Sequence, residues 1–585
     1  MHLLRTETVS LDQTAEAVDL DLSPAEILFL SFTDSDLSGL VSAWERRTIS
    51  GSSLRATSLK NLQHPFSVDL FIEKTAAHAK FILVRLLGGK DYWAYGVDEL
   101  ARLAREKTIA LAIIPGDYQS DQRLNDASSL NEDALTILWR CFHESGRDNF
   151  SRAIDHITAH LGLSTAPETP QEQPAVSRFD QACRNLGVDA PYALILAYRS
   201  IVIADDTAPL TALADALHAR GFSVECLAVS SLKDPAAIRG LEAHLQKRRP
   251  DIILNTTAFS AKRDDGSTVL DACKVPVLQT ILATTREEPW HESTRGLNAA
   301  DLAMNIVLPE LDGRLVTRAI SFKAESEPTA DTEFVKVFHK PVSDRIHFVA
   351  DLSVNWVKLA RIPNNEKKLA LILSDYPHKG GHQAYAVGLD TPASVIALAE
   401  DLKRAGYDIK DLPASGSLIH ELSHHHQGET LTAQTYRTLF HALPRTFRER
   451  VVHAWGDTPD RDFSFPVARY GSLLVALQPL RGSRDDQKTD YHDATRPPSH
   501  EYIAFYLWLT RVYQPHALIH CGTHGTLEWL PGKSVALSQN CTPEILLGSL
   551  PVIYPFIVNN PGEAAQAKRR LSAITIGHQI GRAHV

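Results

Sequence analysis

The sequence predicts a multidomain α/β protein built from parallel sheets with helices on both faces. Two observations carry this prediction: a strand–helix–strand pattern that occurs twice, and a third segment that begins in the same way. The first copy consists of the apolar run ALIL at residues 193–196, a helical stretch at 209–220 and a second apolar run at 223–229. Two strands joined through a helix lie parallel in one sheet, and the helix packs on a face of that sheet.

The second copy opens with the same four letters at residues 370–373. It continues with a helical stretch at 392–404 and a short strand at 406–409. A glycine follows the helix in each copy, Gly221 in the first and Gly406 in the second, which is where helices commonly end. The sequence therefore predicts the same helix boundary twice.

The amino-terminal segment begins like the two copies, with a strand at residues 27–32 and a helix at 37–46. All three segments are thus expected to form flavodoxin-like units, in which ligands bind beyond the carboxyl ends of the strands.

Composition divides the chain into blocks. A length of 585 residues suggests several domains, at about 150 residues each. Residues 164–178 hold three prolines and no aromatic residue, which is typical of a linker, and residues 323–336 are predicted to be a second linker. The predicted domains are an N-terminal α/β domain at 1–163, a second α/β domain at 179–322 and a third domain at 337–585.

Charge and cysteine usage exclude several classes of protein. The chain has 60 Lys and Arg against 70 Asp and Glu, a formal charge of -10, which argues against a nucleic-acid binder or an anionic-membrane binder. No apolar run approaches the roughly 18 residues that span a bilayer, and the first residues lack the apolar stretch of a signal peptide. The six cysteines contain no CxxC pair and are expected to be reduced thiols. The cytoplasm is the expected location.

The most informative motif is His520, His524 and Glu528, which recur at a spacing of four with Gly522 and Gly525 between them. Imidazole and carboxylate groups hold borderline divalent metals and move protons near neutral pH. They also form structural hydrogen-bond networks, and the spacing leaves all three roles open. Because the apolar run 517–519 precedes the motif, we expect it to lie in the loop after a strand, at the ligand-binding end of a sheet.

Two further histidine groups are candidates. His492 and His500 flank a loop shortly before the motif and could bring a further ligand or base. A denser cluster looks like a metal site and comprises His420, His424, His425 and His426. The alternative for that cluster is a solvated helix end.

The segment PGKS at residues 531–534 resembles the end of a phosphate-binding P-loop. That motif needs a glycine at position 527, where the chain has Leu527, so we reject this interpretation. Any ATP hydrolysis is then expected from another chain.

The string HCGTHGTLEWLPGK at residues 520–533 closely resembles the signature of the large-subunit family of cobaltochelatase and magnesium chelatase. Residues 537–570 continue the resemblance. Upstream segments favour the cobalt branch; these are residues 85–96, 115–117, 198–200, 295–305 and 388–394. The resemblance stops at residues 576–578, and the family's subunits are longer. The chain is therefore expected to be the amino-terminal part of such a subunit, with residues 337–585 as the start of its chelatase core.

The resemblance implies insertion of Co²⁺ into a corrin-type tetrapyrrole, hydrogenobyrinic acid a,c-diamide, during cobalamin biosynthesis. It also implies two partners, an AAA+ ATPase subunit and a companion chelatase subunit, which use ATP and Mg²⁺. The alternatives are a magnesium chelatase subunit that inserts Mg²⁺ into protoporphyrin IX, and a tetrapyrrole-binding fragment without turnover.

The resemblance also suggests roles for individual residues. The expected catalytic residues are His524, Glu528 and His520; the expected metal ligands are His520, His524, Glu528 and His492; and the expected substrate contacts are Lys533, Trp529 and Arg569. In these contacts the basic side chains would hold carboxylates at the edge of the macrocycle. Trp529 would stack on the ring, or it would belong to the core.

Overall fold

The computed structural model describes most of the chain. The described residues are 17–47, 52–116, 121–164, 168–329, 331–374, 390–424, 429–482, 495–522, 525–556 and 561–577. They form two compact units. The first comprises residues 1–177, 198–207 and 324–338, and the second comprises 178–197, 208–323 and 339–585. Among the described residues, no helix is both long and apolar enough to span a membrane.

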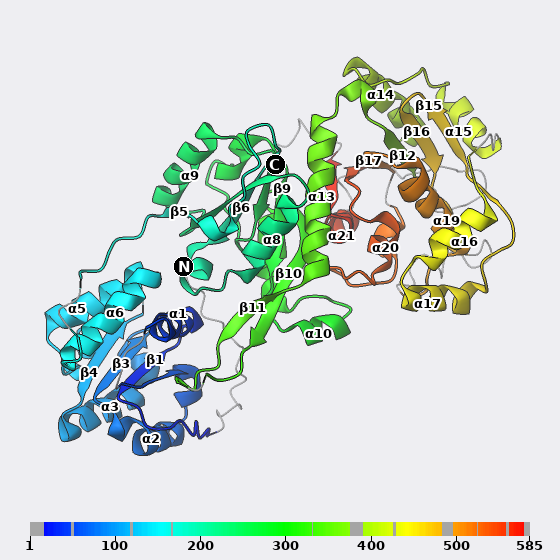
Figure 1. Ribbon diagram of the computed structural model, residues 1–585. Helices are drawn as coiled ribbons and strands as arrows, with labels where there is room; N and C mark the ends of the chain where they lie inside the picture. Colours follow the sequence, from blue (N-terminus) through cyan, green and yellow to red (C-terminus); the bar gives the residue numbers. More distant parts are fainter. Residues whose placement is uncertain are drawn as a thin grey trace. The chain divides into compact units, whose positions relative to one another are not determined.

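The first unit contains a four-stranded parallel sheet in the order β2-β1-β3-β4 (Figure 1). The strands are almost entirely buried because helices cover both faces. One face packs against α2 and α3, and the other against α1, α5 and α6. The bounds are β1 Ile27–Ser31, β2 Leu54–Ser58, β3 Phe81–Leu86, β4 Ala110–Pro115, α1 Asp34–Glu45, α2 Pro65–Lys74, α3 Ala94–Lys107, α5 Glu132–Glu144 and α6 Arg147–His160.

The second unit contains two larger sheets. The first of them has seven strands in the order β11-β10-β9-β8-β6-β7-β5, and its central strands β6, β8, β9 and β10 run parallel. The bounds are β5 Val176–Arg178, β6 Tyr192–Tyr198, β7 Ser223–Val229, β8 Ile252–Asn255, β9 Val277–Leu282, β10 Leu315–Glu325, β11 Val337–Pro341, α8 Ala208–His218, α9 Pro235–Lys247 and α13 Ser343–Arg361.

The other sheet of this unit has six strands in the order β15-β16-β12-β17-β18-β19. All are parallel to their neighbours except β15, which is an antiparallel edge strand. Helices α14 and α15 cover one face, while α16, α17, α19, α20 and α21 cover the other. The bounds are β12 Leu369–Leu373, β15 Val467–Tyr470, β16 Leu473–Leu477, β17 Ala517–Cys521, β18 Val552–Phe556, β19 Ile574–Gly577, α14 Thr391–Arg404, α15 Ser415–His424, α16 Ala433–His441, α17 Arg445–Trp455, α19 His500–Leu507, α20 Thr542–Leu547 and α21 Pro561–Leu571.

The predicted α/β fold with helices on both faces of parallel sheets is confirmed. The strand predicted at 223–229 is β7, and the helix predicted at 392–404 is α14 within one residue. The strand expected at 406–409 is wrong: these described residues form no strand, and the backbone of Asp408 instead hydrogen-bonds to Ser472 beside the edge strand. Gly406 ends α14 with a φ of 88°, which a glycine adopts without strain.

The order of the six strands places a switch point at β12. The chain leaves β12, adds β16 on one side, and then returns to add β17 on the other side. In such sheets, crevices for ligands form at the carboxyl ends of the strands on either side of the switch. His520 is the fourth residue of β17 and pairs in register with Ile372 of β12.

Candidate functional site

The candidate site lies at the carboxyl ends of β16, β17 and β18. His520 comes from the end of β17 and Tyr554 from β18, while Gln478 directly follows β16. Glu528 lies in a single 3₁₀ turn, Leu527–Trp529, after β17. These side chains are far apart in the sequence, and the parallel order of the strands brings them together.

His520 is held on two sides. Its Nε2 atom lies 2.8 Å from Oε1 of Gln478, and its ring stacks on that of Tyr554 with centroids 4.8 Å apart at an angle of 13°. The side chain is buried, with 2% of its surface exposed. Because the Gln478 oxygen accepts this bond, Nε2 carries the hydrogen, and a neutral His520 has its lone pair on Nδ1. That nitrogen is the one suited to a metal or a proton.

Glu528 is also buried, with 1% of its surface exposed. Its Oε1 atom accepts hydrogen bonds from the Tyr554 hydroxyl at 2.8 Å and from the Gly525 amide at 2.9 Å. Burial, followed by the nearby charge of Glu528 and their hydrogen bond, raises the pKa of Tyr554 well above its usual value. Tyr554 therefore stays a phenol and donates, so it links the carboxylate to the ring stacked on His520.

A larger residue fits at position 525 only if the side chains of His520 and Glu528 shift. A Cβ atom there would lie 2.7 Å from Nε2 of His520 and 2.9 Å from Oε2 of Glu528. Real Cβ atoms essentially never make contacts that short. The glycine thus lets the loop pass between the imidazole and the carboxylate.

A buried hydrogen-bond network supports Gln478. Its amide nitrogen donates to the Thr526 hydroxyl, which lies 2.7 Å from the hydroxyl of Tyr502 on α19. Burial raises the pKa of Tyr502, so that hydroxyl keeps its proton. The network ties the loop after β16 to the loop after β17 and fixes the amide that holds His520.

Arg570 holds the backbone of the loop that carries Glu528. Its guanidinium donates to the carbonyl of Glu528, to that of Leu530 at 2.7 Å and to that of Lys533 at 3.0 Å. Burial lowers the pKa of Arg570 to about 10, which still leaves it charged at neutral pH. Arg570, the last residue of the basic run at 568–570, therefore lies in the core.

The residues predicted to contact substrate have protein partners. The Lys533 ammonium donates to the carbonyls of Trp290, of His291 at 3.1 Å and of Ser293 at 2.7 Å, and burial lowers the pKa of Lys533. Arg569 forms a two-armed pair with Glu310 at 2.8 and 2.7 Å. To bind substrate, Lys533 and Arg569 would have to exchange these protein partners for groups of the substrate. Their substrate roles therefore stay predictions.

Trp529, the third predicted substrate contact, is partly buried, and its carbonyl accepts a hydrogen bond from Arg481 at 3.3 Å. Its predicted stacking role also stays a prediction.

Several predicted residues lie outside the described part of the chain. They include His524 and His492 of the expected catalytic and metal sets, and His425 and His426 of the dense cluster. Across the ranges that the structure describes, no three His, Cys, Asp or Glu side chains are grouped so as to hold a metal ion. The metal site remains a prediction.

His500 belongs to a different environment. Its Nδ1 atom lies 2.6 Å from the Tyr436 hydroxyl, and its Nε2 atom lies 3.0 Å from the Gly456 carbonyl. Burial is the main cause that lowers the pKa of His500. Both ring nitrogens thus fix the start of α19, as a neutral imidazole can do with one donor and one acceptor.

Sequence reasoning missed Gln478, Thr526, Tyr502 and Tyr554. Gln478 carries the same signal that singled out His520, because it is a polar residue directly after an apolar strand. Tyr554 is the third residue of the apolar strand β18, which runs parallel to β17 as its neighbour. The contacts of Thr526 and Tyr502 have no comparable signal in the sequence.

The fold and site define an α/β protein with a buried imidazole and a buried carboxylate, both in contact with one tyrosine, at the carboxyl end of a parallel sheet. Comparison with known proteins places it more narrowly. A model of the CobN/Magnesium Chelatase family matches residues 139–583, and the chain belongs to this family. The resemblance found at residues 520–533 is therefore confirmed.

Individual relatives agree with this assignment. The chain is 39% identical to a protein named aerobic cobaltochelatase subunit CobN from Sinorhizobium sp., over 99% of this chain and 48% of the relative. It is 37% identical to a protein of the same name from Pseudomonas aeruginosa PAO1, over 99% of this chain and 49% of the relative. The chain thus spans about half the length of the curated relatives it matches.

A solved structure agrees as well. The catalytic subunit of cobaltochelatase from Mycobacterium tuberculosis superposes with a TM-score of 0.77 at 29% identity, over 95% of this chain and 47% of that subunit.

Proposed function

We propose that the chain belongs to the large, tetrapyrrole-binding subunit of an ATP-dependent cobaltochelatase, which inserts Co²⁺ into hydrogenobyrinic acid a,c-diamide in cobalamin biosynthesis. The observation that carries the proposal is the 39% identity to a protein named aerobic cobaltochelatase subunit CobN, which extends over 99% of this chain. The 29% identity and TM-score of 0.77 to a solved cobaltochelatase subunit support it.

The chemistry of metal insertion fits the groups at the site. The macrocycle must lose its inner N–H protons, and a carboxylate or an imidazole is a suitable base. Tyr554 and the Gly525 amide both bind Oε1 of Glu528, which fixes the orientation of the carboxylate. We assign the proton-accepting role to Glu528, with His524 as the second base.

The metal is a substrate here and has to leave its ligands. Imidazole nitrogen suits Co²⁺, and a ligand set that is short of full coordination releases the ion more readily. Nδ1 of His520 is the nitrogen that carries the lone pair, and we assign it to the incoming metal together with His524, Glu528 and His492. Lys533, Trp529 and Arg569 keep their proposed place at the edge of the macrocycle.

The energy source is assigned to partner subunits. The PGKS segment lacks the first glycine of a P-loop, because position 527 is leucine. We propose that an AAA+ ATPase subunit and a companion chelatase subunit supply ATP hydrolysis with Mg²⁺, and that the reaction takes place in the cytoplasm.

The second candidate is insertion of Mg²⁺ into protoporphyrin IX, since the matched family includes magnesium chelatase. The upstream segments at residues 85–96 and 295–305 favour the cobalt branch. A tetrapyrrole-binding role without turnover is the third candidate, and it predicts macrocycle binding with no insertion of either metal.

Insertion assays test the proposed roles directly. In the full-length subunit with its partners, Glu528→Gln and His524→Ala are each expected to lower the rate of Co²⁺ insertion by about 100-fold or more, because general-base catalysis contributes typically 10²–10⁴-fold. Lys233→Gln serves as the control, since it removes an exposed charge far along the sequence from the site. Wild-type rates in both variants would show that these residues are not the bases, and insertion of Mg²⁺ in place of Co²⁺ would favour the second candidate.

A further inference from the structure

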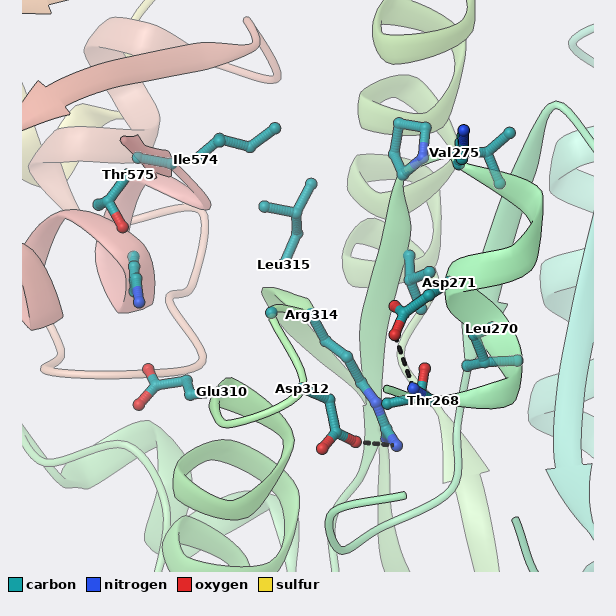
Figure 2. Close-up of a pocket in the computed structure, with 16 residues that line it drawn as sticks. Thr268, Leu270, Asp271, Val275, Glu310, Asp312, Arg314, Leu315, Ile574 and Thr575 are labelled. Atoms are coloured by element: carbon teal, nitrogen blue, oxygen red, sulfur yellow. Dashed lines mark hydrogen bonds and ion pairs between the residues drawn. The ribbon is translucent and has the colours of Figure 1, made fainter. Parts of the chain in front are cut away.

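A cavity of about 430 Å³ opens in the second unit where β9 and β10 begin (Figure 2). Its walls come from residues 268–277, from residues 310–315 and from Ala573–Thr575 at the start of β19, with Lys568 of α21. It lies at the amino ends of these strands, whereas His520 lies at the carboxyl end of β17. Small-molecule sites commonly measure about 300–1,000 Å³, so the cavity is large enough for a small ligand.

Much of the wall is apolar. The apolar side chains that line it are Leu270, Val275, Pro276, Val277, Leu315, Ala573 and Ile574. They provide a surface for a hydrocarbon or aromatic body.

Three of the six charged side chains in the wall are already in ion pairs. Asp312 binds the Arg314 guanidinium at 2.6 Å, as Figure 2 shows, and Arg314 also donates to Gln279 at 3.0 Å. Glu310 binds Arg569. Buried or half-buried pairs of this kind cancel each other's charge, so they contribute structure and little net field.

Lys274 and Lys568 differ from these pairs. Within the described part of the chain, neither ammonium makes a hydrogen bond or an ion pair, and both side chains line the cavity. The remaining carboxylate of the wall, Asp271, accepts a hydrogen bond from the Thr268 amide at 2.6 Å. The lining itself has as many carboxylates as basic groups, but Arg569, from outside the lining, neutralises Glu310. Two unpaired ammonium groups against the one remaining carboxylate therefore leave a surplus of one positive charge beside the apolar wall.

We propose that this cavity binds a small amphipathic anion, in which an apolar body lies against the aliphatic wall and one acidic group binds Lys274 and Lys568. The proposal is independent of the chelatase function, since neither Lys274 nor Lys568 belongs to the His520 site, the group formed by His520, Gln478, Glu528 and Tyr554.

The cavity shares a helix with that site. The last turn of α21 places Lys568 in the cavity wall, Arg569 on Glu310 of the same wall, and Arg570 on the carbonyl of Glu528. An anion on Lys568 therefore contacts the helix turn that holds the loop of Glu528.

Titration with 1-anilinonaphthalene-8-sulfonate tests the proposal, because this dye combines an aromatic body with one sulfonate and fluoresces in apolar sites. We expect one saturable site on the folded chain. Lys274→Gln and Lys568→Gln should each weaken the affinity about three- to fivefold, the usual size of one partly exposed charge contact. Lys233→Gln, which removes an exposed charge elsewhere, should leave the affinity unchanged.

A second arm tests the need for charge and the place of binding. Octanoate should displace the dye and 1-octanol at the same concentration should not, while Tyr554→Phe at the other site should leave the dye affinity unchanged. The proposal is wrong if the folded chain shows no saturable binding, or if both lysine variants bind the dye like Lys233→Gln. It is equally wrong if 1-octanol competes as well as octanoate, or if the affinity follows Tyr554→Phe instead of the lysines.

Discussion

At the scale of single residues, the site depends on side chains that hold His520 and Glu528 in one orientation. Tyr554 stacks on His520 and hydrogen-bonds to Glu528, so one phenol positions both. Gln478 fixes which nitrogen of His520 carries the hydrogen. Partners of this kind commonly determine the tautomer of a functional histidine.

Gln478→Leu tests the hydrogen bond to His520. The variant leaves the Nε2 hydrogen buried without its acceptor, which typically costs about 1–3 kcal/mol of stability. We expect the urea midpoint to fall, and we expect the ¹⁵N signals assigned to His520 to show the Nε2–H tautomer in the wild type but a mixture in Gln478→Leu. The hydrogen on Nδ1 in the wild type would contradict the assigned orientation of Gln478.

Gly525→Ala tests the close passage of the loop. The added methyl would meet His520 and Glu528 at 2.7 and 2.9 Å, and overpacking of this kind typically costs about 1–3 kcal/mol. The matched control is Gly416→Ala in α15, where an added Cβ meets nothing within 4 Å besides the helix's own backbone and alanine favours the helix. Denaturant unfolding should show a loss for the first variant and none for the second. Equal stabilities would mean that the loop does not pass between the two side chains.

At the scale of elements, parallel strands assemble the site and buried cations hold its loop. Arg570 of α21 binds three carbonyls between Glu528 and Lys533, and Lys533 binds the carbonyls at the end of α10, Glu287–Glu292. An unpaired buried carbonyl is costly, so these contacts make the loop part of the core.

Because His500 is buried at the start of α19, we expect the stability of the protein to depend on pH. A neutral His500 donates from Nε2 to Gly456 and accepts at Nδ1 from Tyr436, and protonation removes that acceptor. Its pKa is lowered in the folded state, so the unfolded state binds the proton first as the pH falls below about 6.5. The contribution of His500 to the free energy of unfolding is therefore fully present above that pH and is lost below it.

The measurement is the urea midpoint at pH 7.5 and at pH 5.5. Wild type should lose more stability between the two than His500→Gln does. An identical loss in the two proteins would show that His500 does not titrate with unfolding.

At the scale of the whole molecule, the sequence predicted the helices and strands better than it predicted the contacts between distant residues. Apolar runs and helix ends placed β7, α8 and α14 because these signals are local. The strand order in the six-stranded sheet is set by pairings over long separations, and so are the contacts of Gln478 and Tyr554 with the His520 loop. No local signal reports them.

Local sequence patterns also failed to predict that some basic side chains are buried and bind backbone carbonyls. Lys533 and Arg570 look like surface residues by type, yet 7% and 6% of their surfaces are exposed. Their partners are backbone carbonyls, which every residue has, so the sequence alone does not indicate such contacts.

We propose that the full-length subunit binds a corrin-type tetrapyrrole at the site that holds His520 and Glu528. The most direct test is a titration of the full-length subunit with hydrogenobyrinic acid a,c-diamide, followed by absorbance, beside a titration with protoporphyrin IX. We expect a saturable spectral shift with the corrinoid that is changed in Glu528→Gln, and no comparable shift with protoporphyrin IX. A folded subunit that shifts only with protoporphyrin IX, or a corrinoid shift that is identical in wild type and Glu528→Gln, would contradict it.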